Sequence, residues 1–293
     1  MSTTTRTTSS LVVEKCTPAI GAEVSGVQLS EAISNDDLFH EIRSLWLTHK
    51  VLFFRDQKLS HGEHRDFAMR FGSLEDHPVA PSHPDHPGIV LIQRQKERST
   101  YENVWHADAT WRQVPPMGAI LKSEIVPDIG GDTMWANMAM AYDRLPDRIK
   151  DRISDLWAIH SIEQSFGGTM TPENRAKLVE ENPPARHPVV VTHPETGEKI
   201  LYVNQGFTTN FVNFARFDRI RVGADYTFES NNLMNYLLHQ VEIPEYQVRL
   251  RWRPGTVAMW DNRSTQHYAV HDYWPAQRNM CRAAIEGVDA PSH

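Results

Sequence analysis

The tripeptide His106-Ala107-Asp108 places an imidazole and a carboxylate two residues apart. Residues two apart in an extended strand point to the same face, so these two side chains would project together. Two histidines and one carboxylate on one face of an octahedron leave open positions for substrates, which suits non-haem Fe(II). The best candidate for the second histidine is His267, within residues 260–268. The alternative is that His106 and Asp108 form a hydrogen-bonded pair at a strand end.

Two arginines could add an anion-binding function to this site. Arg278 and Arg282 share one face of a predicted strand over residues 278–285, because side chains in a strand alternate between its two faces. Arginines that face a barrel interior are costly unless they meet anions, and a guanidinium can grip a carboxylate through two hydrogen bonds. If His267 faces inward, a turn at residues 272–277 would bring both arginines beside the metal. The alternative places both arginines on the outer surface.

Short strands separated by turns must position these residues. Several helices accompany the strands, and no βαβ rhythm is evident in the pattern. These features predict a mainly β fold with flanking helices (α+β), such as a β-sandwich or jelly roll with helices on one face. The predicted strands lie near residues 11–14, 21–27, 51–54, 88–95, 118–123, 133–135, 189–192, 199–203, 247–252, 257–260 and 278–285, and the predicted helices near 35–49, 60–71, 137–145, 147–159 and 232–241.

The chain divides into a tail and one domain. Residues 1–10 are rich in Ser and Thr and lack an apolar leader, so we expect a disordered N-terminal tail that is not a signal peptide. Residues 11–288 form the predicted single domain. Two segments within it, near 73–100 and 161–182, are expected to be active-site lids, because long excursions in compact domains often carry that function.

A Pro/His-rich stretch over residues 77–87 contains His77, His83 and His86. Three histidines so close together could belong to a second metal site. The nearby prolines impose irregular, extended backbone, so the alternative is a loop that lines the surface or a pocket.

Composition limits the possible partners. The chain has 293 residues and a formal net charge of −7, with both signs mixed along it, which argues against a nucleic-acid partner. No run approaches the roughly 18 apolar residues of a membrane span, so we expect a cytoplasmic protein with no membrane partner. Cys16 and Cys281 lie at opposite ends of the chain. They predict neither a disulfide framework nor a thiolate metal site.

Taken together, the ordered motifs resemble the TauD/TfdA family of Fe(II)- and 2-oxoglutarate-dependent dioxygenases over residues 11–288. The family implies a double-stranded β-helix (jelly-roll) core. The motifs that carry the resemblance are Trp105-His106-x-Asp108-x-Thr110, Gly130-Gly131-Asp132-Thr133, Trp260-Asp261-Asn262-Arg263-x-x-x-His267, and Arg278 with Arg282.

The resemblance implies a role for each matching residue. His106, Asp108 and His267 would bind Fe(II). Arg278 would grip the distal carboxylate of 2-oxoglutarate, helped by the hydroxyl of Thr133. The residues expected to contact the substrate are Arg282, which would meet its acidic group, together with His77, Phe166 and Phe207. Ordinary core packing is the alternative for the two phenylalanines.

The implied reaction consumes O₂, converts 2-oxoglutarate to succinate and CO₂, and hydroxylates a C–H bond of a small anionic organic substrate. Desaturation or epoxidation at the same site is an alternative, as are a zinc hydrolase and a non-catalytic protein that binds a small acid or metal. Ala80 stands where the family's taurine enzymes carry a tyrosine, which puts taurine itself in doubt. The resemblance also suggests a homo-oligomer, either a dimer or a tetramer.

Overall fold

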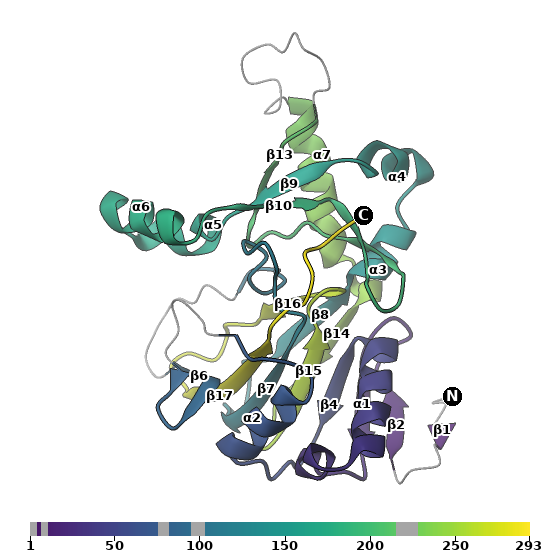
Figure 1. Cartoon of the computed structure of the whole chain (residues 1–293), viewed down its shortest axis with the longest axis vertical. Coiled ribbons are helices and arrows are strands. Elements are labelled where there is room, and N and C mark those ends of the chain that lie inside the picture. Colours follow the sequence, from purple (N-terminus) through teal and green to yellow (C-terminus); the bar gives the residue numbers. More distant parts are fainter. Residues whose placement is uncertain (1–4, 7–10, 76–81, 95–102, 215–227) are drawn as a thin grey trace.

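A nine-stranded sheet forms the base of the fold (Figure 1). The computed structural model describes residues 5–6, 11–75, 82–94, 103–214 and 228–293. The order of strands across the sheet is β1 (Thr5–Arg6), β2 (Val12–Lys15), β3 (Ala22–Ser25), β4 (Val51–Phe54), β15 (Val257–Asp261), β7 (Gly118–Ile125), β17 (Arg278–Ile285), β6 (His86–Arg94) and β5 (Ser82–His83). β1 pairs with β2, so Thr5 and Arg6 belong to the sheet and not to the disordered tail expected for residues 1–10. The rest of that tail lies outside the described residues.

Two helices cover one face of this sheet, α1 (Asp36–His49) and α2 (His61–Met69). Asn35 caps α1, because its side chain accepts a hydrogen bond from the Leu38 N–H. A capping box between Ser60 and Glu63 begins α2. The apolar faces of the helices pack on alternate residues of β4, β15 and β17. β3 and β4 are parallel with η1 (Leu29–Ile33) and α1 between them, so the fold contains one βαβ unit that the sequence pattern did not reveal.

A three-stranded sheet covers the opposite face, in the order β14 (Gln247–Leu250), β8 (Thr133–Asn137) and β16 (Thr265–Ala269). Aromatic side chains fill the space between the two sheets. The ring of Trp135 on β8 lies 5.4 Å from that of Phe53 on β4 and 5.7 Å from that of Trp260 on β15. The two sheets therefore form a sandwich, which confirms the predicted mainly β fold with flanking helices.

The elements above the sandwich in Figure 1 surround a second apolar core. β9 (Trp157–His160) is the centre of a small sheet between β10 (Ala185–Pro188) and β13 (Thr208–Phe211). The helix predicted over residues 147–159 ends at Ile153. A turn follows, and Trp157–His160 form β9, whose side chains alternate in burial as those of a strand do. The remaining elements are β11 (Val190–Thr192), β12 (Lys199–Leu201), α3 (Met138–Asp143), α4 (Asp147–Ile153), α5 (Glu163–Phe166), η2 (Gly167–Thr169), α6 (Pro172–Glu181), α7 (Phe228–Leu238), η4 (His239–Glu242) and η5 (Pro244–Tyr246). Among the described helices, none is long and apolar enough to cross a bilayer.

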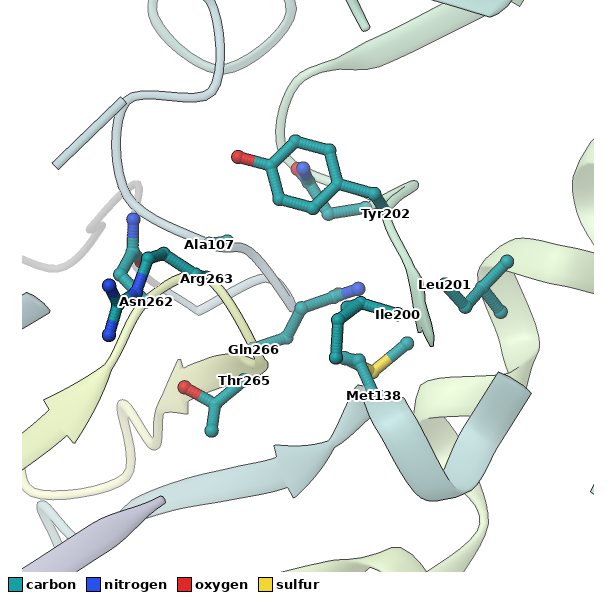
Figure 2. Close-up of a pocket in the computed structure, with 10 residues that line it drawn as sticks. Ala107, Met138, Ile200, Leu201, Tyr202, Asn262, Arg263, Thr265 and Gln266 are labelled. Atoms are coloured by element: carbon teal, nitrogen blue, oxygen red, sulfur yellow. The ribbon is translucent and has the colours of Figure 1, made fainter. Parts of the chain in front are cut away.

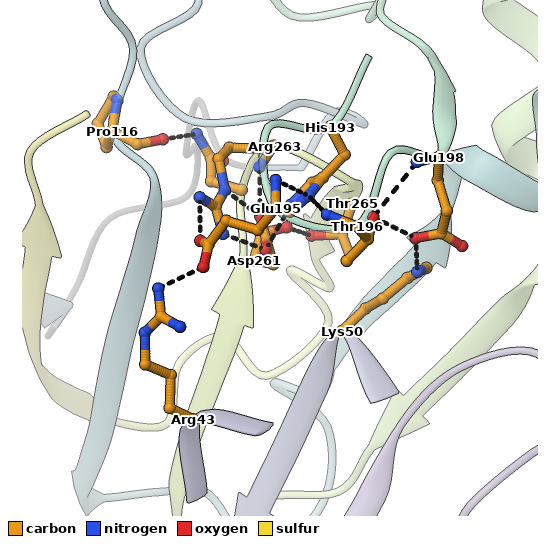
Figure 3. Close-up of polar contacts among 11 residues, drawn as sticks. Arg43, Lys50, Pro116, His193, Glu195, Thr196, Glu198, Asp261, Arg263 and Thr265 are labelled. Atoms are coloured by element: carbon orange, nitrogen blue, oxygen red, sulfur yellow. Dashed lines mark hydrogen bonds and ion pairs between the residues drawn. The ribbon is translucent and has the colours of Figure 1, made fainter. Parts of the chain in front are cut away.

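A buried ion-pair network ties the end of β15 to the turn at residues 193–198 (Figure 3). Asp261 lies 2.9 Å from His193 Nε2 and 2.6 Å from Arg263 Nη2, and Arg263 Nη1 donates to Glu195 Oε1 at 2.7 Å. Burial by itself would raise the pKa of Asp261, but Arg263 and His193 outweigh it and hold that pKa well below its usual range. The network fixes the start of the segment that leads to His267.

We expect Asp261→Asn to lower the free energy of unfolding by about 2–3 kcal/mol, because it removes the buried charged partner of His193 and Arg263 and leaves Arg263 paired only with Glu195. The pKa of Asp261 is depressed, so its stabilisation is present above the unfolded value of about 3.9 and is lost as pH falls through the lower folded value. Urea denaturation at neutral pH measures the difference, with Asp151→Asn on the exposed side of α4 as the control. Equal stability of the two variants would contradict this account.

Candidate metal centre and active site

His106 and His267 are neighbours across an antiparallel bridge. The His106 N–H donates to the His267 carbonyl at 3.0 Å, and the His267 N–H donates to the His106 carbonyl at 2.8 Å. Their rings lie 4.1 Å apart, centre to centre. His267 is held in place because β16 pairs with β8, where Trp135 lies opposite it. Backbone pairing therefore brings together two histidines that are far apart in the sequence.

Asp108 completes the set by a route that the sequence pattern did not predict. The expected strand ends at His106, and a turn begins at Asp108, followed by Ala109 with a φ of 48°. The Asp108 carboxylate nevertheless turns toward the histidines, with Oδ1 at 3.8 Å from His106 Nε2 and 3.9 Å from His267 Nε2. The ligand atoms of the three side chains all lie within 4.8 Å of one another. Three converging donors of this type could hold a divalent metal.

The surroundings of the two histidines suit metal binding. Burial, together with the adjacent His106, lowers the pKa of His267 to about 3, so its imidazole is neutral. His106 Nδ1 lies 2.8 Å from the Val104 carbonyl oxygen. Donation to that carbonyl places the ring proton on Nδ1 and leaves the Nε2 lone pair facing Asp108 and His267.

Asn262 positions the backbone of Asp108. Its Oδ1 accepts from the Asp108 N–H at 2.6 Å, and its Nδ2 donates to the Asp108 carbonyl at 3.0 Å and to the Pro116 carbonyl at 2.9 Å. The hydroxyl of Thr110 is held in turn by Asn204 Nδ2 at 3.0 Å. Asn262 and Thr110 lie within the quoted motifs, but their spacing alone did not reveal that they support the metal ligands.

We expect Asn262→Ala to reduce both the affinity for Fe(II) and the rate of succinate formation by about 10- to 100-fold, the usual effect of removing a group that orients a metal ligand. Iron titration and turnover assays on the same preparation measure the two effects. Asn174→Ala on the exposed face of α6 is the matched control. If Asn262→Ala keeps full iron affinity, Asn262 does not support the ligand set.

Arg278 and Thr133 lie together in the interior of the protein. Arg278 Nη2 is 3.4 Å from Thr133 Oγ1, which also accepts from Trp252 Nε1 at 2.9 Å. The Arg278 guanidinium lies 5.9 Å from the centres of the Trp252 and Tyr273 rings. Gly131 is required here: its φ is +69°, and a Cβ would come within 3.3 Å of Arg278 Cδ.

Arg282 reaches the metal ligands directly, because Nη1 donates to Asp108 Oδ1 at 2.9 Å. Met280 and Ala284 on the same face of β17 belong to the core between the two sheets. The expectation that Arg278 and Arg282 face the interior is therefore confirmed, and the surface alternative is wrong.

The fold also places a buried carboxylate that sequence reasoning did not identify. Glu75 Oε1 lies 2.9 Å from Arg112 Nη2. Burial raises the pKa of Glu75, while the charges of Arg282 and Arg112 act to lower it. No sequence pattern marked Glu75, since its partners come from distant segments.

The two phenylalanines predicted to contact the substrate lie at different distances from the metal ligands. Phe207 is buried, and its ring lies 6.0 Å from that of His106 and 4.6 Å from that of Trp111. Phe166 packs on the other side of Trp111, with a ring separation of 6.1 Å. Phe207 thus lies beside His106, whereas Phe166 packs against Trp111 and not against a metal ligand. His77 lies outside the described residues.

A small cavity lies behind the metal motif (Figure 2). It is lined by Ala107 and Asn262, and by residues of α3 and β12 such as Met138 and Ile200. None of the predicted site residues lines this cavity. This cavity is therefore not the place where a substrate would meet His106, Asp108 and His267.

A β-sandwich that carries two histidines and a carboxylate at one point, with two inward-facing arginines nearby, has the donor set of a non-haem Fe(II) oxygenase. Comparisons with known proteins agree. The family model "Taurine catabolism dioxygenase TauD, TfdA family" matches residues 13–284. The chain therefore belongs to the TauD/TfdA family.

Individual relatives refine this assignment. The chain is 38% identical to an alkylsulfatase of Acinetobacter baylyi over 96% of this chain and 86% of the relative. It is 34% identical to an alpha-ketoglutarate-dependent sulfate ester dioxygenase of Pseudomonas putida, over 92% of this chain and 87% of the relative. The crystal structure of a taurine dioxygenase from Burkholderia xenovorans superposes with a TM-score of 0.79 at 31% identity and covers 97% of this chain and 93% of that one.

The chain is thus a dioxygenase that depends on Fe(II), 2-oxoglutarate and O₂. The jelly-roll core expected from the family resemblance is confirmed by the match to these solved structures. The family assignment therefore replaces the two alternatives considered from the sequence, a zinc hydrolase and a non-catalytic binding protein.

Proposed function

We propose that this enzyme hydroxylates the carbon next to the acidic group of a small anionic substrate, and that sulfate esters of small alcohols are the first class to test. The observation that carries the proposal is the position of Arg282, whose guanidinium lies 2.9 Å from Asp108 Oδ1. An anion that binds this arginine would present its neighbouring C–H bond to the metal. The names of the two relatives, an alkylsulfatase and a sulfate ester dioxygenase, support sulfate esters. Sulfonates and carboxylates are the other anionic substrates to test.

We infer that His106, Asp108 and His267 bind the iron. A set of two imidazoles and one carboxylate whose ligand atoms lie within 4.8 Å of one another fits Fe(II). When bound, Fe(II) and 2-oxoglutarate supply the oxidising chemistry, in which O₂ is consumed and 2-oxoglutarate becomes succinate and CO₂. The protein holds the reactants in place and excludes water from them.

Arg278 and Thr133 are the proposed binding site for the distal carboxylate of 2-oxoglutarate. A buried guanidinium is suited to a two-pronged hydrogen bond with a carboxylate, and the Thr133 hydroxyl lies 3.4 Å from Arg278 Nη2. The Trp252 and Tyr273 rings confine the guanidinium, so little freedom is lost when the co-substrate binds.

For a sulfate ester, the proposed hydroxylation occurs at the carbon that bears the ester oxygen. The C–H bond is replaced by C–OH. The C–O bond to sulfate then breaks, which releases an aldehyde and inorganic sulfate, and the hydroxyl proton leaves with the sulfate. Sulfate release therefore requires oxidation and depends on 2-oxoglutarate. Desaturation or epoxidation would release no sulfate.

Phe207 and His77 are further proposed contacts of the substrate, as is Phe166. Phe207 is supported by its position beside His106, where the missing side chain of Gly206 allows the approach: a Cβ there would lie 2.8 Å from His106 Cβ. The proposed lids are residues 73–100 and 161–182. The second contains α5 and α6, and Ser165 Oγ donates to the Gly206 carbonyl at 2.6 Å, which links it to the metal site.

The proposal extends to assembly and location: a cytoplasmic homo-oligomer, dimeric or tetrameric, with no nucleic-acid or membrane partner. The net charge of −7 supports the lack of a nucleic-acid partner. Light scattering after size exclusion, a nucleic-acid binding assay and cell fractionation test the three parts.

The deciding experiment follows succinate, sulfate and O₂ with Fe(II)-loaded enzyme and a panel of small acids: alkyl sulfates, alkanesulfonates, taurine and aryloxyalkanoates. We expect alkyl sulfates to couple succinate formation to equal sulfate release. Sulfate release without 2-oxoglutarate would contradict the oxidative mechanism. Coupled turnover of another acid, with none of the alkyl sulfates, would keep the dioxygenase and exclude the sulfate ester.

We expect Arg282→Gln to raise the KM for the coupled anionic substrate by about 30-fold or more, since a charge-assisted hydrogen bond at a partly buried site is worth about 2 kcal/mol or more. The KM for 2-oxoglutarate should change little, because that co-substrate is assigned to Arg278. Parallel titration of both substrates provides the measurement, and Arg186→Gln on the exposed side of β10 is the control. An unchanged KM for the anion would remove Arg282 from substrate binding.

A further inference from the structure

A second group of metal-binding side chains lies on the helix-covered face of the large sheet, away from His106, Asp108 and His267. It combines His61 at the start of α2, Glu124 on β7 and Cys281 on β17. His61 Nε2 lies 2.8 Å from Glu124 Oε1 and 3.3 Å from Cys281 Sγ. The three ligand atoms all fall within 4.8 Å of one another. The cluster joins a helix and two adjacent strands through their side chains.

Two further imidazoles border this cluster. β5 and β6 form a hairpin that places the His83 ring 4.7 Å from that of His61 and the His86 ring 4.9 Å from that of His83. His83 Nδ1 accepts the Asp85 N–H at 3.1 Å, so the proton of the neutral ring lies on Nε2 and His83 borders the cluster without offering it a lone pair. Three histidines, a carboxylate and a thiol thus meet at one place, and two of the histidines come from the Pro/His-rich stretch.

We propose that His61, Glu124 and Cys281 bind a thiophilic divalent cation such as zinc, and that a water molecule completes the coordination. Cysteine, histidine and glutamate are the ligands of four-coordinate zinc sites. Ligand atoms around a tetrahedral zinc lie about 3.3–3.6 Å apart, given bonds of about 2.0–2.3 Å. The 2.8 Å between His61 Nε2 and Glu124 Oε1 would widen toward that range when the cation binds, and the 3.3 Å between His61 Nε2 and Cys281 Sγ already lies at its lower end.

Without the cation, the cluster is a hydrogen-bonded group. Burial, and then the charge of Glu124, raises the pKa of Cys281 to about 12, so the sulfur carries a proton. Lys122 Nζ lies 3.7 Å from Glu124 Oε1 and offsets part of the carboxylate charge. When the cation binds, the S–H bond breaks, the proton is released to solvent and a sulfur–metal bond forms. No oxidant or reductant is needed.

The position of this cluster gives the cation a structural effect on catalysis. Cys281 faces α2, whereas Arg282, the next residue, faces the metal ligands of the active site. A cation at Cys281 would fix β17 to β7 and α2. It would therefore restrain the strand that carries Arg278 and Arg282, without contacting the substrate.

Titration with Co²⁺ tests the proposal, because a thiolate–cobalt bond gives an intense near-ultraviolet charge-transfer band. The His106, Asp108 and His267 set contains no sulfur, so the band reports only the second site. We expect the band in the wild type and in Cys16→Ser, which alters the other, exposed cysteine. We expect its loss in Cys281→Ser and a strong reduction in His61→Gln and Glu124→Gln.

Absence of the band in the wild type would overturn the proposal, as would its persistence in Cys281→Ser. Cys281 is buried, and its replacement could prevent folding, so His61→Gln provides a second test at a partly exposed position. After zinc loading and dialysis, elemental analysis should show that His61→Gln retains one zinc equivalent fewer than the wild type. Equal zinc in the two proteins would also overturn the proposal. His106→Ala should lose the other equivalent and keep the cobalt band.

Discussion

Asp108→Ala should reduce succinate formation by about a thousandfold or more, because loss of the bound metal removes several kcal/mol of transition-state stabilisation and each 1.4 kcal/mol is a factor of ten in rate. Asp108 is the only carboxylate of the set, and both histidine Nε2 atoms face its Oδ1. Its loss also leaves the Arg282 guanidinium without the Asp108 carboxylate to which it donates. We therefore expect weaker Fe(II) binding as well as slower turnover.

Iron titration followed by a succinate assay at saturating iron separates these two effects. Asp108→Asn keeps the shape of the side chain but not its charge, and should lose most of the activity. Asp143→Ala at the exposed end of α3 should behave like the wild type. Full activity of Asp108→Ala at saturating iron would show that Asp108 is not a required ligand. It would contradict the proposal that His106, Asp108 and His267 together bind the iron.

Arg278→Gln should raise the KM for 2-oxoglutarate by about 30-fold to several thousandfold, because truncation of one partner of a buried, hydrogen-bonded charge pair costs about 2–5 kcal/mol. Arg278 is buried beside Thr133, and the Trp252 and Tyr273 rings leave its guanidinium little freedom to find another anion. Arg278→Lys should be intermediate, since lysine keeps the charge but lacks the planar fork.

Steady-state titration of 2-oxoglutarate at fixed, saturating iron provides the measurement. Fe(II) affinity should remain near the wild-type value, which distinguishes this variant from Asp108→Ala. Arg253→Gln, at an exposed position between β14 and β15, is the matched control. If Arg278→Gln has a normal KM for 2-oxoglutarate, the co-substrate carboxylate binds elsewhere.

The period-two pattern of residues 278–285 was the most informative local signal. It placed Arg278 and Arg282 on one face, and the structure puts that face against the inner core while Cys281 and Ala283 face α2. Alternation predicts this result because a strand covered on both faces must assign each side chain to one of them. The same pattern over residues 157–160 was overlooked, and a helix was wrongly extended through them.

The geometry around Asp108 could not be predicted from local periodicity. The residues from Asp108 to Thr110 form a turn, which Asn262 holds through the Asp108 backbone from 154 positions further along the chain. Glu75 and its partner Arg112 were missed for the same reason. Contacts of this kind depend on which segments the fold brings together, and local sequence patterns do not encode that information.

The sequence alone determined the class of fold, the family and the identity of the candidate site residues, because binary patterning and ordered motifs are properties of local sequence. The tertiary structure decided how these residues meet. His106 and His267 are paired by backbone hydrogen bonds, and Arg282 contacts Asp108. The tertiary structure also brought together His61, Glu124 and Cys281, which no spacing in the sequence connects. Strands from distant parts of the chain become neighbours only in the folded sheet.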